Sequence, residues 1–189
     1  MLEVRSTGEL RSNGKTLSGY AAIFNSETDL GSFVEVIRNG AFRKSLEGGA
    51  NIRALYHHQG DALLGTTRGG TLKLREDAKG LAFDLALPDT THGRDLAILV
   101  DRGDVAGCSF GFKVREGGDR WELRGAQTVR ELLDVELHEV TLTHDPAYTD
   151  TSIALRSKPI LDIRAVDLGT RSARASHRWQ RRARSSRNV

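Results

Sequence analysis

Residues 104–114 of this 189-residue chain read DVAGCSFGFKV, and this stretch decides the predicted fold. Its apolar side chains fall on every second position, at Ala106, Cys108, Phe110, Phe112 and Val114. Because successive side chains of a β-strand point to opposite faces, this alternation predicts a strand with one face in the core. The other face carries Gly107, Ser109 and Gly111. Between two glycines the Ser109 hydroxyl is expected to be unshielded, so that another chain can approach its backbone.

Other β-prone runs lie on both sides of this strand. Residues 71–75 and 81–87 alternate apolar and polar positions around a polar turn, which predicts a β-hairpin. The remaining predicted strands are 16–24, 33–37, 52–58 and about 129–143, with a polar loop after residue 24 and a Gly-flanked connector before residue 129.

Only two short helices are predicted. Residues 40–46 precede a Gly-Gly pair, and residues 93–102 place Leu96, Leu99 and Val100 on one helical face, with Gly103 suited to end the helix. Many strands and few helices predict a mainly β fold with a few short helices. The expected architecture is a closed or nearly closed β-barrel with peripheral helices.

Charge divides the chain into two parts. Seven of the 28 basic residues lie between Arg171 and the C-terminus, where no acidic residue occurs. The rest then has 21 basic against 25 acidic side chains, a net charge of about −4. We therefore predict a domain over residues 1–156 and a basic, Arg- and Ser-rich tail over residues 157–189, expected to be disordered.

Several protein classes are excluded by composition. No apolar stretch approaches the roughly 18 residues that a membrane-spanning helix needs, and the N-terminal residues lack the apolar centre of a signal peptide. The single cysteine, Cys108, cannot form an internal disulfide and fits a reducing cytoplasm. No cofactor or metal is expected, because the histidines show no metal-binding spacing.

Ser109 could serve as a nucleophile, but a serine hydroxyl needs a base within hydrogen-bond reach. His57 and His58 end the predicted strand 52–58, where alternation places them on opposite faces and puts His58 beside Tyr56. A carboxylate that orients the histidine is the usual third member of such a site. Glu139 is a candidate on the polar face of the last strand, although no spacing rule joins residues 58, 109 and 139.

Five blocks of the sequence, in order, resemble the phage prohead (capsid-maturation) proteases. They are Gly19–Ser26 with Gly40–Phe42, Arg53–His58, Leu64-Gly65 with Gly70–Leu72, Arg102–Phe112, and Glu139–Leu142 with Pro146–Tyr148. The resemblance covers roughly residues 15–155. It implies an assemblin-like barrel and a serine endopeptidase that acts inside the immature capsid, in the cytoplasm of the bacterial host.

The resemblance also implies roles for residues. Ser109 would be the nucleophile, His58 the base and Glu139 the orienting acid. Two departures from the family pattern leave alternatives open: the His57-His58 doublet makes the base ambiguous by one position, and His144 competes with Glu139 for the third role. Cys108 lies on the apolar face of its strand, where a thiol is normally inert.

The implied substrates are the scaffold, or the scaffold-like N-terminal segment of the major capsid protein, and the protease itself. A homo-oligomer is expected, because assemblin-like folds often dimerise. The tail could solubilise the protein, recruit it to an acidic scaffold, or bind nucleic acid weakly, the last being the least favoured. The alternative function is a catalytically inactive capsid-assembly or scaffold protein with the same fold.

Overall fold

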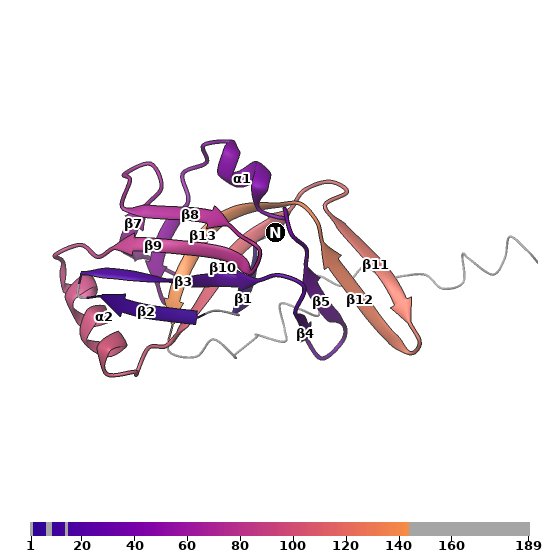
Figure 1. Ribbon diagram of the computed structural model, residues 1–189, viewed down its shortest axis with the longest axis horizontal. Helices are drawn as coiled ribbons and strands as arrows, with labels where there is room; N and C mark the ends of the chain where they lie inside the picture. The colour runs from indigo at the N-terminus through magenta and orange to yellow at the C-terminus, as the bar shows by residue number, and fades with distance from the viewer. Residues whose placement is uncertain (1, 7–8, 14, 144–189) are drawn as a thin grey trace, which may run out of the picture. The chain divides into compact units, whose positions relative to one another are not determined.

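The structure is a computed structural model that describes residues 2–6, 9–13 and 15–143, and the predicted domain boundary and tail lie outside these residues. The described part is built of strands with two short helices, which confirms the predicted mainly β fold (Figure 1). One sheet has five strands in the order β1-β10-β13-β6-β7. These strands are β1 (Glu3–Ser6), β10 (Gly107–Val114), β13 (Val135–Thr143), β6 (Arg53–Tyr56) and β7 (Gln59–Thr66).

Two four-stranded sheets complete the described fold. The first has the order β11-β12-β5-β4, made of Asp119–Arg124, Gln127–Leu132, Val34–Ile37 and Glu27–Asp29. The second has the order β2-β3-β9-β8, made of Glu9–Asn13, Thr16–Ile23, Gly80–Ala86 and Leu72–Glu76. Within the described residues no sheet closes into a barrel. The strands instead form three open sheets that contribute to one main core, with two small separate clusters, one of Leu30 and Phe33 and one of Val34, Val36 and Val129.

The core is built on the predicted apolar face of β10. Cys108, Phe110 and Phe112 are completely buried, and the Phe110 ring lies 5.4 Å from the Phe42 ring in an edge-to-face arrangement. Ala106, predicted to share this face, is exposed and precedes the strand. The strand starts late because the backbone N–H groups of Asp104 and Val105 donate to the Leu99 carbonyl at the end of the preceding helix.

Both predicted helices are present, as α1 (Arg43–Glu47) and α2 (Thr91–Asp101). The α2 helix begins two residues before its predicted start, because the Thr90 side chain accepts a hydrogen bond from the Gly93 N–H and caps it. After α2 the chain turns at Gly103, whose φ of 82° favours glycine. Neither helix is long and apolar enough to span a membrane.

The single strand predicted over residues 129–143 is wrong in one respect. The structure has two strands there, β12 and β13, and they belong to different sheets. The chain breaks at Leu133-Asp134 because both backbone N–H groups donate to the Gly118 carbonyl rather than to a neighbouring strand. The predicted connector before residue 129 contains β11, which pairs with β12 as an antiparallel hairpin (Figure 1).

A buried cluster of charged side chains ties β1 to the sheet that contains β12. Arg130 pairs with Glu3, Glu35 and Asp119, and Arg5 pairs with Glu3 and Glu35. Burial raises the pKa of the Glu3 carboxyl, but the hydrogen bonds and charges of Arg130 and Arg5 outweigh burial, so the pKa is lowered. The cluster thus holds β1, which pairs with β10 in the register Ser6 to Ser109.

Candidate active site

Ser109 lies on β10, on the face opposite the core side chains. Its Cα pairs with that of Thr141 on β13 and with that of Ser6 on β1, so the strand is flanked on both sides at this point. The prediction of an unshielded hydroxyl is therefore wrong, because Ser109 is completely buried. The Ser109 Oγ lies 2.7 Å from His58 Nε2, which brings the predicted nucleophile and base into hydrogen-bond contact.

His58 stands in the two-residue turn between β6 and β7. The predicted strand over residues 52–58 is too long: β6 ends at Tyr56, which pairs with Gln59, and the φ angles of His57 and His58 are 50° and 57°. Positive φ at both central positions is typical of a type I′ hairpin turn, in which Asn-Gly is the common pair. Because histidine is not a usual turn signal, the pattern suggested a longer strand.

The turn gives the two histidines different surroundings. His57 packs its ring 4.1 Å from the Tyr56 ring, and its Nδ1 lies 3.5 Å from Thr143 Oγ1. Only His58 contacts the Ser109 hydroxyl among the hydrogen bonds of the described site. The prediction that the two histidines lie on opposite faces of a strand does not hold, because neither residue is in a strand. The geometry favours His58 for the base.

Glu139 completes the arrangement from β13. Its Oε1 lies 2.6 Å from His58 Nδ1, and its side chain is 6% exposed. Because an ionised carboxylate only accepts hydrogen bonds, Nδ1 must be the donor. The neutral imidazole then has Nε2 free to accept the proton of the Ser109 hydroxyl. The three candidate residues are thus joined by two hydrogen bonds, while His144 lies outside the described residues.

A β-bulge gives Glu139 its direction. Gly111 pairs with Glu139 and Phe112 pairs with Leu137, so β13 has one extra residue, His138, at this point. Before the bulge the buried apolar positions of β13 are Val135 and Leu137, and after it they are Val140 and Leu142. This change of phase is visible in the sequence and could have predicted the bulge. Bulges often re-aim side chains near active sites.

Gly111 makes room for the Glu139 side chain. A Cβ atom at position 111 would lie 2.8 Å from Glu139 Cγ and 3.2 Å from Cδ. The first distance is shorter than a Cβ atom tolerates and the second is tight, so a larger residue requires a shift of the Glu139 side chain, whose carboxylate contacts His58. From the sequence, the glycine is expected to give access to the Ser109 backbone. The structure instead relates it to the carboxylate on the neighbouring strand.

We expect Gly111→Ala to lower kcat on the order of 10-fold to 100-fold, because a displacement of about 1 Å in a catalytic group has effects of this size. The measurement is steady-state cleavage of a peptide that spans the capsid cleavage site. Gly60→Ala is the matched control, because a Cβ there meets no atom within 4 Å. Equal activity of the two variants would show that the close approach at Gly111 is without consequence.

The arrangement can perform acyl transfer. A serine hydroxyl hydrogen-bonded to an imidazole, which is itself hydrogen-bonded to a buried carboxylate, has the geometry of an activated nucleophile. Cys108 has a different environment on the opposite strand face: it is completely buried, and burial raises the pKa of its thiol far above the ordinary value. Among residues 2–6, 9–13 and 15–143, no group of three His, Cys, Asp or Glu side chains could hold a metal ion.

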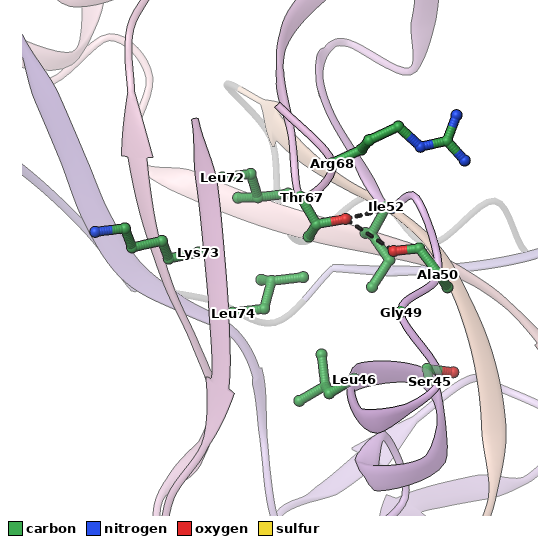
Figure 2. Close-up of a pocket in the computed structure, with 10 residues that line it drawn as sticks. All are labelled: Ser45, Leu46, Gly49, Ala50, Ile52, Thr67, Arg68, Leu72, Lys73 and Leu74. Atoms are coloured by element: carbon green, nitrogen blue, oxygen red, sulfur yellow. Dashed lines mark hydrogen bonds between the residues drawn. The ribbon is translucent and has the colours of Figure 1, made fainter. Parts of the chain in front are cut away.

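A separate hollow of about 370 Å³ lies between α1 and β8 and includes none of the three candidate residues. Figure 2 shows Leu72 and Leu74 on the side of β8 that faces the hollow, with Lys73 pointing to the other side of the strand. The Thr67 hydroxyl closes one wall by donating to the Ala50 carbonyl and accepting from the Ile52 N–H. The lining combines apolar side chains with Ser45, Thr67, Arg68 and Lys73, and it includes none of the hydrogen-bonded groups around Ser109.

Comparisons with known proteins agree with this site chemistry. Residues 1–164 match the family described as caudovirus prohead serine protease. Among solved structures, the bacteriophage T4 capsid assembly protease gp21 aligns with a TM-score of 0.54 and 8% sequence identity, over 76% of this chain and 96% of that chain. At such low identity the likeness shows the fold alone. A search of curated proteins finds no match.

Proposed function

This chain belongs to the caudovirus prohead serine proteases, since the family match spans residues 1–164 of 189, and we propose that Ser109, His58 and Glu139 form its catalytic triad. The predicted resemblance to prohead proteases is thereby confirmed, and the protein is a serine protease of capsid maturation. We further propose that it cleaves the scaffold, or the scaffold-like N-terminal segment of the major capsid protein, and itself. Its proposed place of action is the immature capsid in the cytoplasm of the bacterial host.

The observation that carries the triad proposal is the unbroken path from the Ser109 Oγ through both nitrogens of His58 to Glu139 Oε1, with contacts of 2.7 and 2.6 Å. The His58 side chain is 32% exposed, whereas the Ser109 and Glu139 side chains are buried. The imidazole therefore borders solvent on one side, where a substrate chain can approach. The carboxylate stays in a dry environment, in which its interaction with an imidazolium is strong.

The proposed reaction has two halves. As Ser109 Oγ forms a bond to the scissile carbonyl carbon, its proton passes to His58 Nε2, and Glu139 stabilises the resulting imidazolium through Nδ1–H. The tetrahedral intermediate collapses, the C–N bond breaks, and the leaving amine takes the proton from Nε2. A water molecule then loses a proton to Nε2 and attacks the acyl-enzyme, and that proton returns to the Ser109 oxygen as the new carboxyl terminus leaves.

The test is co-expression with the major capsid protein of the same phage, for wild type and Ser109→Ala, followed by intact-mass measurement. We expect truncation of the capsid protein with wild type only, because loss of the nucleophile leaves on the order of 10³-fold to 10⁴-fold rate enhancement over water. The masses also locate the cleavage site. Equal truncation with both proteins would place the nucleophile elsewhere, and no truncation with either would favour the inactive assembly protein.

A further inference from the structure

The second oxygen of the Glu139 carboxylate also has a partner. While Oε1 faces His58, Oε2 lies 3.3 Å from the Nη2 of Arg53, a residue of β6. The Glu139 side chain is 6% exposed and the Arg53 side chain 45% exposed. The arginine thus reaches from the surface to the buried carboxylate. No local pattern in the sequence indicates this contact, since Arg53 and Glu139 lie 86 positions apart.

Strand register brings the two side chains together. Arg53 is the direct partner of Glu139 in the parallel pair β6–β13, and Gly111 is its direct partner in the antiparallel pair β10–β13. The glutamate therefore stands between a cation on one side and a residue without a side chain on the other. Its side chain lies over Gly111, within 3.4 Å of a Cβ built there, while the guanidinium contacts it from the opposite strand.

This arrangement restricts the rotation of the Glu139 carboxylate about its terminal torsion. The terminal torsion of its carboxylate is broad, so burial alone does not determine how the carboxylate plane is rotated relative to the imidazole. A hydrogen bond to Oε2 removes that freedom and leaves Oε1 aimed at His58 Nδ1. We propose that Arg53 is a positioning residue, which acts on catalysis only through the orientation of Glu139. The proposal rests on the proposed triad.

The proposed positioning role predicts that loss of Arg53 changes catalysis and leaves folding stability unchanged. Pairs with one largely solvated partner contribute little to folding stability, so we expect Arg53→Ala to unfold at the same denaturant concentration as wild type. Its effect should appear in kcat, because the orientation of Glu139 is needed when the imidazolium forms. The KM should not change, because Arg53 in this role does not contact the substrate.

The first test compares Arg53→Ala, Arg53→Lys and the control Arg75→Ala on a peptide that spans the capsid cleavage site. Arg75 pairs with Asp84 across the β8–β9 hairpin, where both side chains are exposed. We expect Arg53→Ala to lower kcat on the order of 10-fold to 100-fold with KM unchanged. Arg53→Lys should recover part of the loss, since it keeps the charge but not the fork-shaped donor, and Arg75→Ala should match wild type. An unchanged kcat for Arg53→Ala would overturn the proposal.

The second test asks whether Arg53 acts through Glu139. In a double-mutant cycle, we expect Arg53→Ala to have no further effect on kcat in a Glu139→Gln background, because the group to be oriented is already altered. Equal losses in both backgrounds, or a raised KM, would show that Arg53 acts independently, for example by binding an acidic substrate side chain, and would contradict the proposal.

A spectroscopic measurement separates positioning from a general structural role. In Ser109→Ala protein, the downfield proton resonance of the His58 Nδ1–H···Glu139 hydrogen bond should shift or broaden on Arg53→Ala and stay in place on Arg75→Ala. An unmoved resonance would contradict the proposal. Failure of the triad itself has a different signature, because Glu139→Gln would then retain activity, whereas failure of this inference leaves Glu139→Gln impaired and Arg53→Ala active.

Discussion

Glu139→Gln is expected to lower kcat by about 10⁴-fold while the fold stays intact, the size of effect found when the triad acid becomes an amide. The glutamine amide group can donate to His58 Nδ1, which favours the imidazole tautomer with its proton on Nε2. That nitrogen faces the Ser109 Oγ at 2.7 Å and could then no longer accept the serine proton. The measurement is kcat on the capsid cleavage-site peptide, with the denaturant midpoint as the test of folding.

Glu136→Gln is the control for this prediction. It makes the same chemical change on the same strand, at a side chain that is 47% exposed and contacts only His138 among the described ion pairs. We expect it to keep wild-type activity. If Glu139→Gln were as active as this control, Glu139 would not be the third member of the triad. His144→Ala would then be the next variant to measure.

Arg130→Met is expected to reduce the free energy of unfolding by about 3–5 kcal/mol, because it removes one partner from a buried charge cluster. The Arg130 guanidinium donates to Glu3 at 2.6 and 3.0 Å, to Glu35 at 3.2 Å and to Asp119 at 2.8 Å. Methionine fills similar space but leaves Glu3 and Glu35 with Arg5 as their remaining cation and removes the Arg130 partner of Asp119. Urea denaturation monitored by tryptophan fluorescence measures the change.

The matched control for this prediction is Arg75→Met, which breaks an exposed pair whose two side chains are 59% and 44% exposed. We expect Arg75→Met to reduce the free energy of unfolding by about 0–1 kcal/mol. Adding Glu3→Gln to Arg130→Met should recover part of the stability, because one uncompensated charge is removed. If Arg130→Met reduced the free energy of unfolding no more than Arg75→Met does, burial of the cluster would not increase its contribution to stability.

Local patterns in the sequence predicted much of the fold. The alternation in residues 104–114 predicted the strand that carries Ser109, and the periodic apolar positions with Gly103 predicted α2. Both features depend on interactions within a few residues, which a single sequence records. The hairpin of β8 and β9 was predicted for the same reason.

The predictions that are wrong concern strand ends that depend on hydrogen bonds to residues far away in the sequence. The His57-His58 turn has no glycine or asparagine to mark it, and the His57 backbone N–H donates to the carbonyl of the distant Leu142 on β13. The break at Leu133-Asp134 depends on hydrogen bonds to Gly118, in a loop that precedes another hairpin. Such contacts leave no trace in the residues immediately around the break.

The sequence by itself determined that this protein is mainly β, that one face of β10 enters the core, and which family it resembles. The tertiary structure alone decided how His58, Ser109, Glu139 and Arg53 meet, because they come from a turn and three strands that pair in both parallel and antiparallel register. Strand pairing between distant segments is selected by the packing of the whole core. No spacing along the chain encodes it, so the geometry of the site follows only once the sheet has formed.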